Sequence, residues 1–279
     1  MVFLNGLKQG DELNNSQLTN VFKCAPQGGM RRSHRTNSLV IISDPYKSLY
    51  MDRWISDTFY YTGMGQVGDQ NLHKDQNKTL NESNKNGVEV YLFEVFEPKK
   101  YTFIGRVQLI ADPFTEKQLD KYNNARVVWV FSLKLKDGFK KLEIDIQKNE
   151  NRKEKQVREA GKLSTEELRR RAELSHGKPG TRSVRSTTFE RDQYIVEYAK
   201  RWANGVCQLC EEKAPFNDKK GKPYFHTHHI KWLSKGGSDT IDNAVALCPN
   251  CHDKMHILNK KSDIKKLIGK VQEHINQLK

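Results

Sequence analysis

Four cysteines form two C-x-x-C pairs in the C-terminal third of the 279-residue chain: Cys207, Cys210, Cys248 and Cys251. Each pair offers two thiolates to one ion, so the spacing predicts a structural Zn²⁺ site with four cysteine ligands. A disulfide framework would spread more cysteines through a smaller secreted chain. The fifth cysteine, Cys24, lies far from these pairs, and we expect it to be a small buried apolar residue.

Five of the nine histidines cluster around the second half of this pattern: His226, His228, His229, His252 and His256. An imidazole exchanges protons near neutral pH and also binds divalent metals, so the cluster favours metal-assisted acid–base chemistry. Adjacent residues on a strand point to opposite faces, so one of His228 and His229 could face a metal and the other a substrate. A zinc ribbon with incidental histidines is the alternative.

The combined pattern resembles the HNH nuclease family, specifically its McrA-like branch with a zinc-knuckled ββα-metal fold. The motif is C-x-x-C, then H-H-I, then D-N-x-V-x-L-C-P-x-C-H, then a further histidine. The resemblance implies phosphodiester hydrolysis with His229 as the general base. It makes His228 and His252 ligands of a catalytic ion, and His256 a third ligand or a phosphate contact. Asn243 would hold the loop and orient the His229 ring.

The implied reaction needs a cation beside the scissile phosphate, to stabilise developing negative charge. Imidazole ligands suit Mn²⁺, Co²⁺, Ni²⁺ or Zn²⁺, and Mg²⁺ also fits. The Zn²⁺ held by the cysteines would be separate and non-catalytic. We expect no residues that bind an organic cofactor.

The elements that must position these residues are of two kinds. Runs of β-branched and aromatic residues predict strands at 38–43, 88–96, 101–110 and 126–133, which suggests a compact barrel or sandwich. Apolar residues at helical spacing predict helices at 191–204 and about 261–278.

Between these regions the composition becomes strongly charged, and Ser164-Thr-Glu-Glu167 has the form of a helix capping box. We therefore expect three parts: a first domain at 1–136, a charged helical connector at 137–190 and a nuclease domain at 191–279.

A second motif lies in residues 50–70, where a Y-T-G-x-G turn follows an aspartate and several aromatic residues. Together with the later D-Q-x-L segment and a V-x-V-x-x-F strand, it resembles the SRA fold, particularly SRA-like domains fused to HNH nucleases. The match covers about residues 20–135. It departs from the family pattern at Gln66, which replaces the second glycine of the usual G-x-G-G turn, and the segment after it is shorter.

This second resemblance implies an α+β chain whose first domain is a PUA/SRA-like β-barrel with flanking helices that flips a modified cytosine out of duplex DNA. Tyr61 and Thr62 match the pocket tyrosine and threonine of the motif. Asp52 is the best candidate to bind the cytosine edge, with Asp57 as second choice, and Tyr50 would stack on the base. Extruding a base costs a few kcal/mol, which such contacts must recover.

Two adjacent arginines, Arg31 and Arg32, precede the first predicted strand. They are candidates for a phosphate clamp, with a solvated basic loop as the alternative. The whole chain carries 48 Lys and Arg against 34 Asp and Glu, a net charge of +14. Such an excess favours a polyanionic partner, here double-stranded DNA.

The localisation follows from what the sequence lacks. No apolar run approaches the ~18–20 residues that span a bilayer. Residues 1–15 lack the charged and apolar regions of a secretory signal. We therefore expect a cytoplasmic protein without a membrane partner.

These observations predict a modification-dependent restriction endonuclease that reads 5-methyl- or 5-hydroxymethylcytosine and cuts DNA. A first alternative is a nuclease that reads another modification, such as phosphorothioate or a glucosylated base, or plain sequence. A second is a non-catalytic zinc-containing DNA-binding protein. Because one HNH site cuts one strand, double-strand cleavage would suggest a homodimer.

Overall fold

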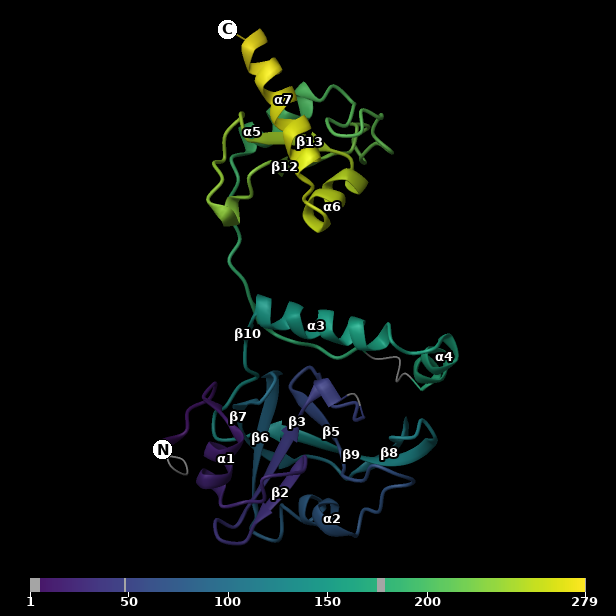
Figure 1. The fold of residues 1–279 in the computed structure, drawn as a ribbon. Coiled ribbons are helices and arrows are strands. Elements are labelled where there is room, and N and C mark those ends of the chain that lie inside the picture. Colours follow the sequence, from purple (N-terminus) through teal and green to yellow (C-terminus); the bar gives the residue numbers. More distant parts are fainter. Residues whose placement is uncertain (1–5, 48, 175–178, 279) are drawn as a thin grey trace. The chain divides into compact units, whose positions relative to one another are not determined.

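The computed structural model describes residues 6–47, 49–174 and 179–278. They form two compact units, residues 1–186 and residues 187–279 (Figure 1). Each unit has its own hydrophobic core. The expected fold class is confirmed: a mixed α+β chain with an N-terminal sheet unit and a C-terminal unit that holds the four paired cysteines. Among the described residues, no helix has both the length and the apolar character needed to cross a membrane.

The first unit is built on a nine-stranded sheet with the order β2-β3-β6-β7-β9-β5-β4, while β1 pairs with β7 and β8 with β9. Its strands are β1 (Glu12–Leu13), β2 (Met30–Ser33), β3 (Ser38–Ser43), β4 (Arg53–Ile55), β5 (Thr58–Thr62), β6 (Glu89–Glu97), β7 (Lys100–Leu109), β8 (Phe114–Leu119) and β9 (Ala125–Leu135). The four predicted strands correspond to β3, β6, β7 and β9. The β3–β6 pair is parallel, and the other pairs of this sheet are antiparallel.

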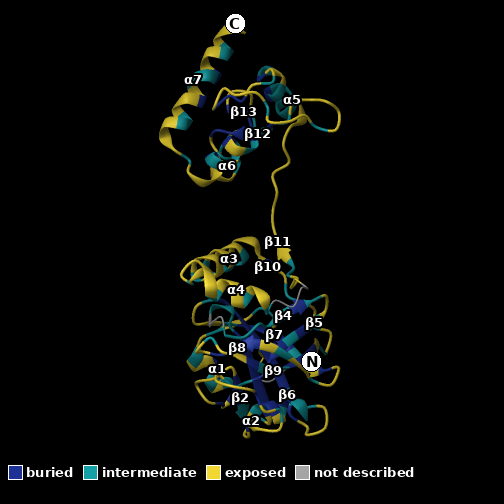
Figure 2. Cartoon of the chain, turned by 90° about the vertical axis from the view of Figure 1, so that its right-hand side faces the viewer, coloured by how far each residue is buried: buried dark blue, intermediate teal, exposed yellow. Residues whose placement is uncertain are grey.

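Strand β3 is buried on both of its faces. Leu39 and Ile41 belong to one hydrophobic cluster, whereas Val40 and Ile42 belong to a second one. This alternation follows from the two-residue repeat of a strand. The second cluster is covered by helix α1 (Asn15–Phe22). Burial on both sides explains why β3 reads as a continuous apolar run, and Figure 2 shows the central strands of the sheet mostly in dark blue.

Among the described residues, the helical segments of this unit include, besides α1, η2 (Pro45–Lys47), α2 (Asp75–Asn81), α3 (Ile146–Ala160) and α4 (Thr165–Glu173). Helix α4 begins with the predicted capping box, in which the Ser164 and Glu167 side chains each bind the other residue's backbone N–H. Neither α3 nor α4 has a fully buried residue. The short strands β10 (Ile144–Asp145) and β11 (Val184–Arg185) pair in parallel.

A buried ion pair connects the end of the charged segment, residues 137–186, to the sheet. Two Arg182 nitrogens donate to the Glu94 carboxylate at 2.7 and 2.8 Å, and the Trp54 indole donates to it at 3.2 Å. Although burial opposes ionisation, the adjacent Arg182 guanidinium holds the pKa of Glu94 below its usual value. The described residues of 137–186 belong to the first compact unit. The division expected from the sequence, with a connector at 137–190, stays a prediction.

The second unit contains α5 (Gln193–Trp202), β12 (His226–His229), η3 (Leu233–Lys235), β13 (Ala244–Leu247), α6 (Pro249–Ile257) and α7 (Lys261–Gln277). Both predicted helices are present, as α5 and α7. Strands β12 and β13 form an antiparallel hairpin, and their core cluster includes residues of α6 and α7. The Trp202 ring stacks on His274 with 4.2 Å between centroids, which joins α5 to α7.

Candidate functional sites

The four paired cysteines converge at one point of the second unit. Their sulfur atoms all lie within 4.8 Å of one another, and none of the four forms a disulfide. The backbone N–H of Cys248 donates to the Cys207 sulfur at 3.3 Å. Cys248 also caps α6, so the first turn of that helix brings Cys251 to the same point. Four thiols at one point are the donor set of a closed structural Zn²⁺ site.

The hairpin directs its two adjacent histidines to different partners. His228 faces the rings of His252 and His256 on α6, with centroids 5.5 and 5.0 Å away. His229 instead faces Asp239. His252 and His256 are four residues apart in α6, so they share one helix face. The ligand nitrogens of His228, His252 and His256 all lie within 4.8 Å of one another.

This three-histidine cluster has the properties of a divalent-metal site. His228 is 2 % exposed, and its Nε2 has no hydrogen-bond partner among the described residues. Burial, with the neighbouring His256 and His252 rings, lowers the pKa of His228 to about 3. Burial likewise lowers the pKa of His252. Neutral imidazoles with a free nitrogen lone pair are the form that binds a metal, so the cluster fits the expected catalytic ion.

The cluster opens onto a cavity of about 560 Å³. His229 lines the same cavity, together with Phe189, Arg191 and Trp232. One guanidinium nitrogen of Arg191 donates to the Thr227 carbonyl at 3.3 Å, which holds this cation beside the histidines. The cavity therefore combines the three-histidine cluster, an additional imidazole and the cationic Arg191 side chain, which suits an anionic substrate.

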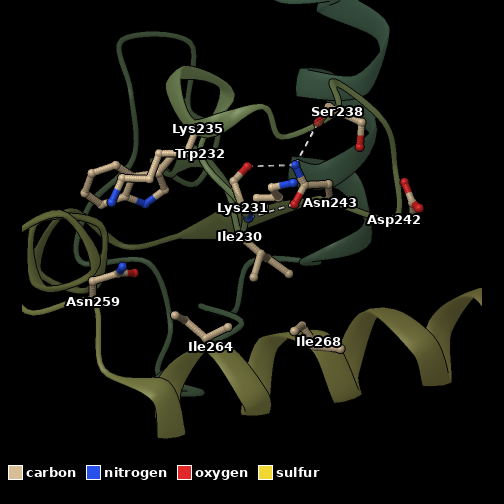
Figure 3. A pocket seen from close by; sticks show the side chains of 10 residues that line it. All are labelled: Ile230, Lys231, Trp232, Lys235, Ser238, Asp242, Asn243, Asn259, Ile264 and Ile268. Carbon is tan, nitrogen blue, oxygen red and sulfur yellow. Dashed lines mark hydrogen bonds between the residues drawn. The ribbon is translucent and has the colours of Figure 1, made fainter.

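Asn243 acts on the backbone around the hairpin. Its side-chain oxygen accepts from the Lys231 N–H at 2.8 Å, and its nitrogen donates to the Lys231 and Ser238 carbonyls at 2.9 and 2.7 Å (Figure 3). Gly237 packs so closely that a Cβ there would lie 2.0 Å from the Lys231 carbonyl oxygen. The loop thus needs a glycine at 237 and is held by Asn243, which is not bonded to the His229 ring in the described contacts.

Two residues of this site, Arg191 and Asp239, had no role predicted from the sequence. Arg191 was included only as the start of an amphipathic helix, and Asp239 lies in the loop between the histidine pair and Asn243. His226, also without an assigned role, stacks on His252 with 4.7 Å between centroids. In the sequence, Asp239 is recognisable only as the acidic residue of the G-G-S-D segment. Its pairing with His229 depends on the geometry of the loop.

In the first unit, Asp52 and Thr62 are brought together. The Thr62 backbone N–H donates to Asp52 Oδ1 at 2.8 Å. Burial raises the pKa of Asp52 to about 7. A carboxyl group with a pKa near 7 is partly protonated at neutral pH. In its protonated form it can both donate and accept hydrogen bonds, as the edge of a nucleobase requires.

The tyrosines of the expected pocket differ in accessibility. Tyr61 is 3 % exposed, and its hydroxyl donates to the Gly29 carbonyl at 3.0 Å. Tyr50 is half-buried, and its hydroxyl donates to the Gly65 carbonyl at 3.1 Å. Burial raises the pKa of both tyrosines, so both stay protonated. Tyr50 therefore has an accessible face, whereas Tyr61 is part of the core.

A cavity of about 730 Å³ lies beside these residues. Ser43, Tyr50 and Asp52 line one side, while Arg152 and Lys155 of α3 are among the residues lining the other. The charged helices after the sheet thus form a wall of this cavity.

The two arginines proposed as a phosphate clamp both lie in β2. Arg31 is 4 % exposed and donates to the Gly28 carbonyl at 2.9 Å and to Asn15 at 2.8 Å. Arg32 donates to the Asn37 side chain at 2.7 Å. Arg31 therefore binds α1 and the adjacent loop, since its guanidinium is enclosed by its own domain.

Comparison with known proteins assigns both units. Residues 207–257 match the family described as HNH endonuclease, and residues 9–147 match the family described as ScoMcrA-like, SRA domain. Both resemblances expected from the sequence are thereby confirmed.

Among curated proteins, the chain is 40 % identical over 90 residues to the type IV methyl-directed restriction enzyme EcoKMcrA of Escherichia coli strain K12, covering 32 % of this chain and 31 % of that protein. It is also 49 % identical over 37 residues to anaredoxin of Nostoc sp., covering 13 % and 49 %. The chain thus spans about a third to a half of the length of these relatives.

Solved structures with similarity include the modification-dependent TagI restriction endonuclease, at 19 % identity and a TM-score of 0.40, covering 91 % of this chain and 79 % of that one. The type IV phosphorothioation-dependent restriction endonuclease ScoMcrA has 17 % identity and a TM-score of 0.40, covering 99 % and 65 %. An SRA domain of SUVH5 bound to fully methylated CG DNA has 22 % identity and a TM-score of 0.38, covering 51 % and 98 %.

Proposed function

Because the chain contains an HNH endonuclease domain and a ScoMcrA-like SRA domain, we propose that it is a type IV restriction endonuclease that cleaves modified DNA. The observation that carries this proposal is the cluster of His228, His252 and His256 beside His229 in one cavity. A zinc module that only binds DNA has no need for an unpartnered buried imidazole next to two others.

The roles in cleavage follow from this geometry. His228, His252 and His256 would hold a divalent ion such as Mg²⁺, Mn²⁺, Co²⁺ or Ni²⁺, which would supply charge stabilisation at the scissile phosphate. His229 accepts a proton from the attacking water. Arg191 binds the phosphate oxygens that its cavity receives, and the cysteine site holds Zn²⁺ and supports the fold.

For the first domain we propose that a modified cytosine, 5-methyl- or 5-hydroxymethylcytosine, is flipped into the cavity beside Asp52. Asp52 would bind the base edge, Tyr50 would stack on the ring, and Thr62 would hold the Asp52 carboxyl through its backbone N–H. Tyr61, which is buried in the core, would support the residues that line the pocket. Arg152 and Lys155 of α3 are better placed than Arg31 to contact a phosphate, because they line the cavity.

DNA binding by the full-length His229→Ala protein tests the proposed recognition of modified cytosine in the absence of cleavage. We expect tighter binding to duplexes with 5-methyl- or 5-hydroxymethylcytosine than to the same unmodified duplex. Asp52→Ala should remove the preference but keep the salt-sensitive binding to all duplexes, because phosphate contacts carry no information on the base. Preference for phosphorothioate or glucosylated DNA instead would reassign the modification, and equal binding to every duplex would refute a reading role.

A further inference from the structure

The loop between η3 and β13 places one carboxylate against the ring of His229, which lines the nuclease cavity. Asp239 Oδ1 lies 2.7 Å from His229 Nε2. Its second oxygen, Oδ2, accepts from the backbone N–H of Asp192 at 2.7 Å. The side chains of His229 and Asp239 are 4 % and 22 % exposed. The carboxylate is thus fixed at both oxygens, at the edge of a nearly buried imidazole.

The residues around this carboxylate are fixed as well. Asp192 is the N-cap of α5, where its own side chain accepts from the Tyr194 N–H at 2.8 Å. On the other side, Asn243 binds the carbonyl of Ser238, directly before Asp239. The hydrogen bond from the Asp192 N–H and that from the His229 ring keep the pKa of Asp239 below its usual value, so this group is an anion.

An anionic carboxylate accepts hydrogen bonds and donates none. The nitrogen facing it, His229 Nε2, must therefore carry the proton, which leaves the lone pair of the neutral ring on Nδ1. A general base needs this arrangement, because its free nitrogen must be the one that faces the reacting water. Carboxylates fix the tautomer of catalytic and metal-binding histidines in the same way in other enzymes.

We propose that Asp239 is a positioning residue that holds His229 as the Nε2–H tautomer, so that Nδ1 takes the proton from water. The oxygen of that water then forms a bond to phosphorus. The bond from phosphorus to the leaving deoxyribose oxygen breaks, and that oxygen keeps the electron pair and takes a proton from solvent. The proposal rests on the endonuclease function proposed above and adds a residue to it, with Asn243 acting one step further away through the Ser238 backbone.

Single-turnover cleavage of the preferred modified duplex provides the first test. Asp239→Asn should lower the rate constant by at least about tenfold, with little change in KM or melting temperature, because the ring loses its fixed tautomer. Asp239→Glu should recover part of the rate. The matched control is Asp242→Asn, an exposed carboxylate of the same loop, which should cleave at the wild-type rate.

A double-mutant cycle separates positioning from a general structural role. In the His229→Ala background, Asp239→Asn should cause no further loss of rate, because the residue acts through that ring. An unchanged rate in Asp239→Asn, or an equal loss with and without His229, would overturn the proposal.

The ring tautomer gives a readout that does not depend on cleavage. Long-range ¹H–¹⁵N correlation spectra of the zinc-loaded full chain should show His229 as the Nε2–H tautomer, with a changed Nε2 signal in Asp239→Asn. Observation of the Nδ1–H tautomer in the wild type would refute the inference. Absence of cleavage of any DNA by a protein with the expected tautomer would instead refute the proposed function.

Discussion

Asp52, which lines the cavity of about 730 Å³ in the first unit, accepts a 2.8 Å hydrogen bond from the backbone N–H of Thr62, the last residue of β5. This bond fixes the carboxyl group through the sheet itself, since β5 pairs with β9 along its whole length. The sheet therefore sets the direction of the one acidic side chain among the proposed base-binding residues.

The raised pKa of Asp52 predicts how stability depends on pH. Its pKa is about 7 in the folded protein and 3.8 without burial. Between these values the unfolded chain is ionised while the folded chain holds the proton, so stability declines as pH rises from about 4 to 7. Asp52→Asn removes this loss and keeps an acceptor for Thr62. We expect it to raise the melting temperature at pH 8 by about 2–4 °C.

Thermal unfolding of both proteins from pH 4 to pH 8.5 provides the check. The difference should be smallest at pH 4, which is close to the pKa of 3.8 of the carboxyl without burial, and should grow as the pH rises to 7. A difference that is constant with pH would mean that Asp52 is ionised in the folded protein.

Arg31 should be a stability residue. Arg31→Gln removes a buried cation that binds α1 and the Gly28 carbonyl, and leaves those acceptors without their donor. Hydrogen bonds to charged groups contribute roughly 1.5–3 kcal/mol, so we expect a clear fall in the free energy of unfolding of the first unit. The salt dependence of DNA binding should stay close to that of the wild type. A stable variant with a reduced salt slope would instead support the phosphate-clamp hypothesis.

The cysteine cluster predicts a zinc-dependent fold for the second unit. Cys248→Ser removes one ligand, so the protein should lose its bound Zn²⁺ and the second unit should melt at a lower temperature, since such binding contributes directly to folding. Zinc content by mass spectrometry and calorimetry measure both effects. Cys24→Ser, a change at a buried lone cysteine of the first unit, should keep the zinc. Unchanged zinc content in Cys248→Ser would contradict a four-cysteine site.

The three-histidine cluster predicts a second, separable metal site. His228→Ala should weaken Mn²⁺ binding and cleavage strongly, because it removes the most buried ligand, yet it should leave the structural zinc in place. The matched control is His226→Ala, two residues earlier on the same strand, since His226 lies outside the cluster, where its ring contacts Tyr224 and His252. Equal Mn²⁺ affinity in the wild type and in His228→Ala would exclude this site.

Features that depend on residues close together in the sequence were predicted, whereas contacts between distant residues were not. Cys207, Cys210, Cys248 and Cys251 are recognisable because short spacings within each pair fix their geometry. Strands such as β3 were predicted because both faces are buried. The Arg182–Glu94 pair was not predictable, because its partners lie 88 residues apart. It is one of several contacts that join the charged segment to the rest of the first unit, with those of Lys148 to Glu12 and of Glu167 to Asn123.

The same limit applies to the two sites. The pairing of Asp239 with His229 depends on a loop that Gly237 and Asn243 shape through backbone contacts, which residue spacing does not reveal. Arg31 was expected to contact phosphate or to lie in a solvated basic loop. In the structure, acceptors from α1 and from the preceding loop compensate its burial. The need for glycine at position 63 was equally hidden in the sequence, because it depends on the Asn77 and Gln70 side chains that pack against the turn.

Cleavage of two matched plasmids in one tube tests the central claim most directly. One plasmid carries 5-methyl- or 5-hydroxymethylcytosine and the other has the same sequence without modification, with Mn²⁺ present and with His229→Ala as the inactive control. The account predicts that the wild type cleaves the modified plasmid at least about tenfold faster, and that His229→Ala lowers this rate by about 10²–10⁴-fold. Equal cleavage of both plasmids, or wild-type rates in His229→Ala, would contradict it.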